Sequence, residues 1–152
     1  MNKINWKKLI VSILIPQVIG GAGAVFTTPK IQSWYMTLNK PFFSPPNWVF
    51  GPVWTLLFLM MGIALYIVWD KKKSLTDKVF KWFWIQMGLN FLWSMIFFGM
   101  ENPGLALVEI VILWWAIFNN IKSFGKVGVW LYPYLAWVSF ATLLNAGVWW
   151  IN

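Results

Sequence analysis

Apolar residues dominate five stretches of the chain, and charged side chains are almost absent from all of them. Each stretch is close to the roughly 20 residues that a helix needs to cross a bilayer core of about 30 Å. None shows the period-2 alternation of a membrane barrel strand, so helices are the expected spanning form. The predicted spans lie at about residues 9–26, 48–69, 79–98, 104–121 and 129–151.

Proline, glycine, asparagine and short runs of charge separate these stretches, as is typical of turns. Pro103 directly precedes the fourth stretch, and the first turn of a helix tolerates proline because the missing N–H would have no partner there. The sequence therefore predicts an all-α fold, a five-transmembrane-helix bundle that forms a single integral membrane domain over residues 1–152.

Composition supports a membrane protein over a soluble one. The chain is 60% hydrophobic and 11% charged, whereas soluble domains are about 45–50% apolar and about 25% charged. The net charge of +8 would also suit a nucleic-acid-binding protein, but 14 Trp and 13 Phe favour a bilayer. We therefore expect the lipid bilayer as a partner and no nucleic acid.

Several kinds of catalytic site are excluded because their residues are missing. The chain has no cysteine and no histidine, and every basic residue is lysine. This removes the thiol nucleophile, the usual general base and the usual metal and haem ligands, so we expect no metal site and no cofactor. The four carboxylates are too scattered to suggest an acid–base pair and an ordinary hydrolase.

The lysines predict an orientation. If five helices alternate across the membrane, ten lysines fall on one side and only Lys30 and Lys40 on the other. Lysine-rich loops stay in the cytoplasm. In a bacterial cell membrane, which is the location we expect, this places the N-terminus in the cytoplasm and the C-terminus outside. The lysine-rich side carries Lys3, Lys7, Lys8, Lys71, Lys72, Lys73, Lys78, Lys81, Lys122 and Lys126.

The first stretch has an alternative interpretation as a cleaved signal peptide. Basic residues, an apolar run and then Ala22–Ala24 are typical of such a segment. The apolar run nevertheless continues through Phe26, and Gly20, Gly21 and Gly23 form a surface of small residues suited to close helix packing. We favour a first membrane span.

Tryptophans near span ends fit the interfacial belt of membrane proteins, but five lie inside the spans. Helical spacing places Trp54 with Phe58, Trp93 with Asn90, and Trp137 with Ala141 and Asn145, in each case on one helix face. The five internal tryptophans are Trp54, Trp93, Trp114, Trp115 and Trp137.

Buried amides usually face the interior of a helix bundle, so Asn90 and Asn145 orient these aromatic faces inward. The faces would then form an apolar pocket for a planar ligand. The alternative is plain helix–helix packing, with both amides bonded to neighbouring backbone. Glu109, inside the fourth span, is a candidate for a structural hydrogen bond or for a ligand or proton role.

The first loop, residues 27–47, is longer than ordinary connections in helix bundles. Its prolines limit flexibility, and the aromatic residues Trp34, Tyr35, Phe42 and Phe43 offer apolar area to bury. We predict a lid over one end of the bundle; the alternative is an exposed linker.

This loop also carries a family resemblance. Residues 34–54, WYMTLNKPFFSPPNWVFGPVW, resemble the signature of the TspO/MBR family, which includes tryptophan-rich sensory proteins, translocator proteins and the peripheral-type benzodiazepine receptor. LNFLW (89–93), ALVE (106–109) and YPYLAW (132–137), followed by Asn145, are similar to the same family.

The resemblance implies a five-helix membrane receptor or sensor for tetrapyrroles such as protoporphyrin IX and haem, and for isoquinoline and benzodiazepine drugs. It also implies a homodimer, and a light- and oxygen-dependent degradation of protoporphyrin IX in which pocket tryptophans act. The matching catalytic candidates are Trp54, Trp93 and Trp137. The matching ligand-binding candidates are Tyr35, Pro45, Trp54, Phe58, Asn90, Trp93, Trp137 and Ala141, to which helical spacing adds Asn145.

Two further functions stay open at this point. One is transport of porphyrin or another apolar solute, although five spans do not divide into the two equal repeats common in transporters. The other is a purely structural or partner-binding role. Sterol binding, attributed to animal relatives, is disfavoured because the end of the fifth span, from Ala141 to Asn152, has neither Tyr nor Lys.

Overall fold

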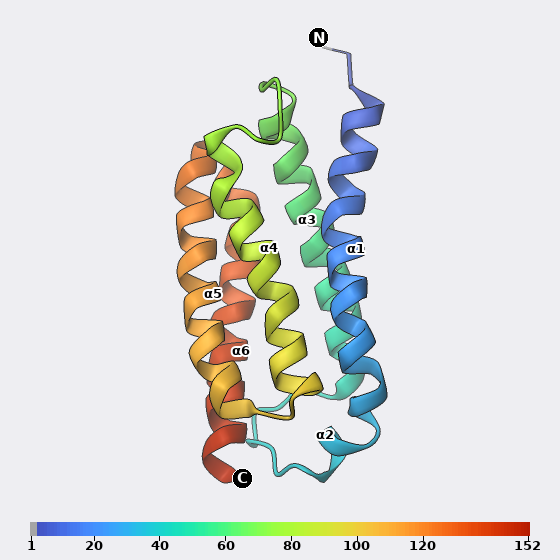
Figure 1. Ribbon diagram of the computed structural model, residues 1–152, viewed down its shortest axis with the longest axis vertical. Coiled ribbons are helices and arrows are strands. Elements are labelled where there is room, and N and C mark those ends of the chain that lie inside the picture. Colours follow the sequence, from blue (N-terminus) through green and yellow to red (C-terminus); the bar gives the residue numbers. More distant parts are fainter. Residues whose placement is uncertain (1–2) are drawn as a thin grey trace.

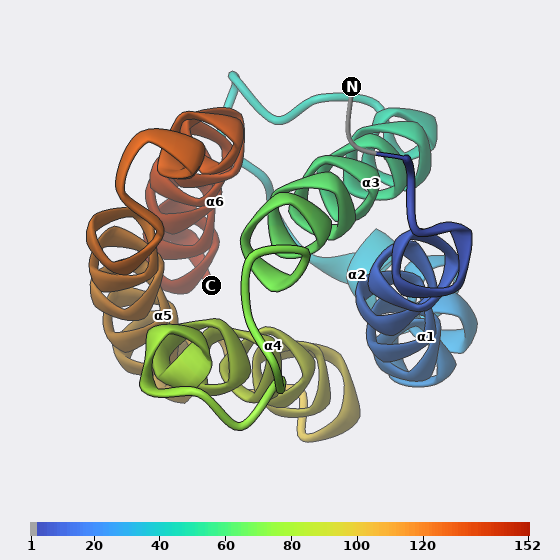
Figure 2. The same cartoon turned by 90° about the horizontal axis from the view of Figure 1, so that it is seen from above.

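The computed structural model describes residues 3–152, and its five long helices stand side by side as a bundle (Figure 1). Viewed from above, they follow one another around a ring in the order α1, α3, α6, α5, α4 (Figure 2). This confirms the predicted all-α, five-helix fold. The helices are α1 (Trp6–Ile31), α3 (Phe50–Trp69), α4 (Lys81–Ser94), α5 (Pro103–Phe124) and α6 (Tyr132–Ile151).

Within residues 3–152, three helical stretches are long and apolar enough to cross a membrane. They are α1, Asn47–Trp69 and the continuous helical stretch Pro103–Ile151, which contains both α5 and α6. The remaining long helix, α4, has only 14 residues in its α-helical part and continues directly into a π-helix, η3 (Met95–Gly99).

Local sequence signals set several helix ends. The Asn5 side chain accepts a hydrogen bond from the Lys8 N–H at 3.2 Å and so caps α1. Asn102 accepts one from the Leu105 N–H at 2.9 Å and caps α5, whose first turn contains Pro103 as predicted. Gly125 ends α5 with a φ of +58°, a conformation that favours glycine.

The observed ends differ from the predicted spans mainly around the first loop. Helix α1 extends past both limits of the predicted 9–26 span and ends only at Ile31, beyond Pro29. The first loop is therefore shorter than predicted, residues 32–46, and contains the short helix α2 (Trp34–Thr37). It leads into a 3₁₀ turn, η1 (Asn47–Val49), at the start of α3.

Two other connections are also helical. The 3₁₀ turn η2 (Lys78–Phe80) precedes α4, and the 3₁₀ segment η4 (Gly125–Leu131) joins α5 to α6. The fifth predicted span, 129–151, thus begins in η4. Its α-helical part starts at Tyr132 because Pro133 occupies the first turn, where proline is tolerated.

The half of the bundle nearest the N-terminus is filled by a solid core. Met61, Leu65 and Phe80 are completely buried there. Phe83 and Phe124 stack with ring centroids 6.2 Å apart. A close-packed core of this kind leaves little free volume, so any sizeable cavity must lie in the opposite half.

All ten lysines assigned to one side by the alternation argument lie at the N-terminal end of the bundle, at the start of α1 and α4, the end of α5, and in the connections there (Figure 1). Lys30 and Lys40 lie at the opposite end, in the last turn of α1 and in the first loop respectively. The structure therefore separates the lysines as the alternation of five helices requires, and the cytoplasmic position of the N-terminal end stays a prediction.

That orientation is testable with reporter fusions at Asn152. Alkaline phosphatase fused there should be active, because it requires export, and a fluorescent protein that folds only in the cytoplasm should be dark. Fusions within the lysine-rich connection at Lys72 provide the matched control and should give the opposite pair of signals. An inactive phosphatase together with a fluorescent reporter at Asn152 would contradict the orientation.

Candidate functional site

A cavity of about 520 Å³ lies beneath the first loop, in the half of the bundle nearest the C-terminus. Its volume is within the range of about 300–1,000 Å³ that is usual for small-molecule sites. All five long helices contribute to its wall. Its main side chains are Tyr35, Phe50, Trp54, Phe58, Asn90, Trp93, Ser94, Phe97, Phe98, Trp137, Ala141 and Asn145.

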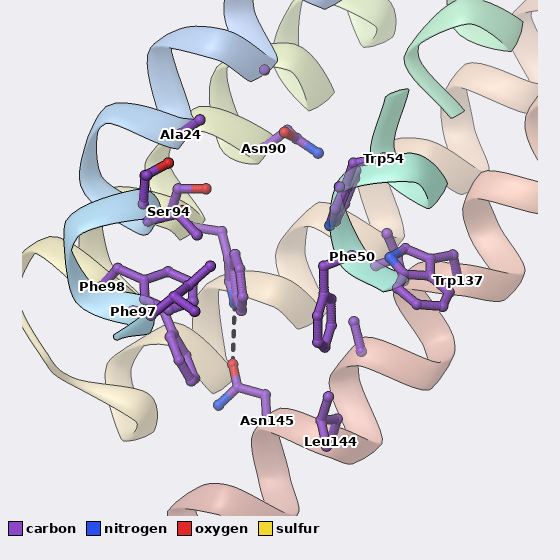
Figure 3. Close-up of a pocket in the computed structure, with 18 of the residues that line it drawn as sticks. Ala24, Phe50, Trp54, Asn90, Ser94, Phe97, Phe98, Trp137, Leu144 and Asn145 are labelled. Carbon is purple, nitrogen blue, oxygen red and sulfur yellow. Dashed lines mark hydrogen bonds between the residues drawn. The ribbon is translucent and has the colours of Figure 1, made fainter. Parts of the chain in front are cut away.

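Two stacked aromatic pairs form flat parts of this wall. Trp54 and Phe58, one helical turn apart on α3, stack with centroids 5.5 Å apart and planes inclined by 27°. Trp93 of α4 and Phe97 of η3 stack at 4.9 Å and 24°. Figure 3 shows Phe97 and Trp54 on opposite sides of the open space. The cavity therefore suits a flat, mostly apolar molecule.

The amides predicted to face inward are held by specific hydrogen bonds. The Asn90 amide donates to the Tyr134 hydroxyl at 2.9 Å. The Trp93 indole N–H donates to the Asn145 side-chain oxygen at 3.1 Å, the dashed line in Figure 3. Asn145 in turn donates to the Pro103 carbonyl at 2.8 Å. The same two amides line the cavity and hold neighbouring helices together. The predicted pocket and the alternative of helix–helix packing are therefore compatible.

One buried polar atom of the wall is left without a partner within residues 3–152. The Trp137 indole nitrogen is buried and makes no hydrogen bond within residues 3–152. A buried N–H without a partner costs about 1–3 kcal/mol. Trp137 lines the cavity beside Phe50 in Figure 3, while its indole nitrogen is itself covered by neighbouring atoms.

The π-helix η3 brings two neighbouring phenylalanines into the wall. The Met100 N–H bonds to the Met95 carbonyl at 2.9 Å, the i→i+5 pattern of a π-turn. Phe97 and Phe98 are both buried, and both line the cavity. These two residues could not be predicted from the regular α-helical spacing expected throughout the third span, which places neighbouring residues on different faces.

Helix α1 also contributes residues that the sequence analysis assigned to helix packing alone. Gly20 lies against the Phe58 ring, where an added Cβ would come within 2.2 Å of it, and Gly23 lies near Ser94. Gly21 instead faces open space and lines the cavity together with Gly20 and Ala24. The run of small residues was the available signal for a cavity wall.

The first loop covers the cavity at the C-terminal end. Tyr35 of α2 is 5% exposed, lines the cavity and packs against Phe97 and Phe98. The Lys40 ammonium lies over its ring, 4.6 Å from the centroid. Burial raises the pKa of the Tyr35 hydroxyl, which therefore stays neutral at physiological pH.

The structure brings together most of the predicted site residues. Pro45 is the exception: it is half-buried in the first loop and does not line the cavity, because Asn47 and Trp48 of η1 occupy that edge instead. The residues that do line it are Tyr35, Trp54, Phe58, Asn90, Trp93, Trp137, Ala141 and Asn145.

Four other residues singled out from the sequence lie outside the cavity wall. Trp114 donates a hydrogen bond to Ser139 at 2.8 Å and packs between α5 and α6, whereas Trp115 is 56% exposed on the outer surface. Glu109 is buried but makes no hydrogen bond within residues 3–152, so the structural hydrogen bond considered for it is not observed. Phe42, expected to help bury the loop, is fully exposed.

Comparison with known sequences identifies the family of this five-helix protein. The TspO/MBR family profile matches residues 12–151, which include most of α1 and all the other helices. The chain belongs to the TspO/MBR family. The family match and the apolar helices together identify an integral membrane protein, and the first helix is part of its bundle.

Named relatives cover almost the whole TspO/MBR chain. The tryptophan-rich protein TspO of Archaeoglobus fulgidus is 45% identical over 152 residues, 98% of this chain and 99% of that protein. The human translocator protein is 35% identical over 151 residues, covering 95% and 89%. The tryptophan-rich sensory protein of Cereibacter sphaeroides is 33% identical over 134 residues, 84% of each.

Proposed function

We propose that this TspO/MBR protein is a membrane receptor or sensor that binds tetrapyrroles such as protoporphyrin IX and haem in the cavity under the first loop. The observation that carries the proposal is the pair of flat aromatic stacks, Trp54–Phe58 and Trp93–Phe97, on the walls of one apolar cavity. Isoquinoline and benzodiazepine compounds share the flat, apolar character that this site favours.

Each predicted residue has a role in this proposal. Trp54, Phe58 and Trp93 stack on the ligand, Trp137 adds a further aromatic part of the wall, and Asn90 offers a polar group that orients the ligand. Tyr35 covers the site from the first loop. Further roles follow for Ala141, whose small side chain leaves room, for Asn145, which positions Trp93, and for Pro45, which stiffens the loop without contact.

The site also favours photochemistry over acid–base catalysis. Neither cysteine nor histidine exists in the chain, whereas oxidisable indoles line the cavity. We propose that light excites the bound porphyrin, that oxygen is the oxidant, and that Trp54, Trp93 and Trp137 take part in the resulting degradation. The homodimer stays a prediction from the family resemblance.

Transport of a porphyrin is the alternative function, and the packing of the bundle disfavours it. The core around Met61, Leu65, Phe80 and Phe83 fills the half of the bundle between the cavity and the N-terminal end. A solute could cross only if this core opened. Flux of protoporphyrin IX into sealed vesicles, compared with vesicles lacking the protein, would reveal transport.

Binding of protoporphyrin IX in the dark tests the proposed function directly. Titration into purified protein should quench tryptophan fluorescence saturably, because several indoles lie in the cavity wall. An isoquinoline ligand should displace the porphyrin, since both would occupy the same cavity. Quenching that rises linearly without saturation, or that the isoquinoline leaves unchanged, would contradict the proposal.

A further inference from the structure

We propose that flat apolar ligands reach the cavity from the lipid bilayer, through a lateral opening between α1 and α3, and not by displacement of the first loop. The proposal rests on the proposed function for its choice of ligand. The lateral opening is lined by Gly21, Ala24 and Thr28 of α1 and by Asn47, Trp48, Gly51 and Thr55 of η1 and α3.

Exposure of the cavity wall locates this opening. The residues of the lateral opening line the cavity and are also exposed on the outside of the bundle. In contrast, the wall residues from α4, η3, α5 and α6 are all buried or half-buried, and so is Tyr35 of the first loop. Within residues 3–152, the cavity wall therefore reaches the outer surface between α1 and α3.

The edges of the lateral opening are set by small residues and by close helix contacts. A Cβ added to Gly21 or to Gly51 would meet nothing within 4 Å, so each of these two positions borders open space. Toward the N-terminal end the opening closes, because Gly20 packs on Phe58 and the Gln17 amide donates to the Thr55 carbonyl at 3.1 Å.

The position of the opening determines the kind of molecule that it admits. Both α1 and the segment Asn47–Trp69 are long and apolar enough to span a membrane. An opening between two such helices faces lipid chains and not water. It would therefore admit molecules that already partition into the bilayer, such as protoporphyrin IX.

The first loop, by comparison, is fastened to the bundle at several points. The Asn152 side chain accepts a hydrogen bond from the Asn39 N–H and donates one to the Asn39 carbonyl, both at 2.9 Å. Pro41 is buried against Gly147, where a Cβ would lie 2.3 Å from the proline ring. Access through the loop requires these contacts to break together, whereas the lateral opening requires no such step.

The absence of cysteine from the sequence permits a sharp test of the loop. A Cβ built at Gly147 lies 3.3 Å from the Pro41 Cβ, close to the separation of about 3.5–4.5 Å found in disulfides. The double variant Pro41→Cys/Gly147→Cys should therefore form a disulfide that locks the loop onto α6. Stopped-flow binding of protoporphyrin IX, supplied in phosphatidylcholine vesicles, should then show association rates within about twofold before and after reduction.

The opposite result is expected when the lateral opening is filled. Gly21→Leu/Gly51→Leu places two side chains in open space without backbone strain. Association and dissociation should both slow by about tenfold while the Kd changes by less than about threefold, because an obstructed path delays both directions equally. Gly88→Leu is the matched control: Gly88 also faces open space but lies on α4, outside the cavity wall, and its rates should not change.

The outcomes separate this proposal from the proposed function. Saturable binding that slows when the disulfide forms, but does not slow in Gly21→Leu/Gly51→Leu, would overturn the lateral route alone. Loss of equilibrium binding in a folded leucine variant would also overturn it, since the glycines would then belong to the site itself. Absence of saturable binding in the unmodified protein would overturn the proposed function, and the route with it. If the double leucine variant does not fold, the single variants Gly21→Leu and Gly51→Leu replace it, each with an expected slowing of about threefold.

Discussion

Light-driven loss of protoporphyrin IX should fall by at least about tenfold in each of Trp54→Phe, Trp93→Phe and Trp137→Phe, while dark binding weakens by less than about tenfold, or roughly 1.4 kcal/mol. Phenylalanine keeps most of the stacking surface, which contributes about 0.5–1.5 kcal/mol per ring beyond area burial. It lacks the indole N–H and the readily oxidised ring. The rate of light-driven degradation should therefore fall more than the affinity for the porphyrin.

The structure distinguishes the three variants further. Trp93→Phe removes a hydrogen bond to Asn145, so part of its effect comes from a wall residue that loses its partner. Trp137→Phe breaks no hydrogen bond within residues 3–152, because that indole N–H has no acceptor there. Any loss of affinity in Trp137→Phe beyond the loss of ring area therefore reports directly on the ligand.

Illumination assays scored against dark binding measure these effects. Trp115→Phe is the control, because Trp115 belongs to the same helix bundle but is 56% exposed and lies outside the cavity wall. It should leave both binding and degradation unchanged. Unchanged degradation in the triple variant, with binding retained, would mean that porphyrin photochemistry without these indoles destroys the pigment.

Gly62→Ala should destabilise the bundle by about 2 kcal/mol or more, the upper range for overpacking a well-packed core. An added Cβ at Gly62 would lie 2.7 Å from the Ile13 Cα and 2.8 Å from the Ser12 carbonyl oxygen. Both atoms belong to the backbone of α1, so no side chain can rotate away to make room. Helices α1 and α3 would have to separate, which would also widen the lateral opening.

Gly88→Ala is the control for this prediction, because it should stabilise the bundle where Gly62→Ala destabilises it. Gly88 is exposed in the interior of α4 and a Cβ there meets nothing within 4 Å. Replacing a helical glycine with alanine in such a place stabilises by about 0.5–1 kcal/mol. Thermal unfolding in detergent measures both variants, and equal melting temperatures for the two would contradict the close-packing argument.

The five-helix architecture could be predicted from the sequence because it follows from the solvent. Backbone groups in a bilayer must be satisfied within the helix, so each long apolar stretch can only be a helix. Asn102 and Pro103 mark the start of α5, and Gly125 marks its end. Helical spacing was equally informative for the site: it placed Trp54 with Phe58 and Asn90 with Trp93 on faces that do line one cavity.

Helix spacing determines the face on which a residue lies, but it does not determine how helices approach one another. The lateral opening exists because α1 and α3 are in contact at Gly62 and Gly20, whereas Gly21 and Gly51 border open space. That difference arises from packing between helices distant in sequence. The unpaired Trp137 N–H and the position of Pro45 away from the cavity have the same origin.

What the sequence by itself determined is the set of helices, the distribution of lysines between the two ends and the inward faces of α3, α4 and α6. The tertiary structure alone decided the cavity, its contribution from α1 and the presence of both Phe97 and Phe98 in its wall. The physical reason is that local periodicity assumes regular helices. The π-helix at Met95–Gly99 departs from that regularity, and cavity volume depends on helix separation, which no single segment encodes.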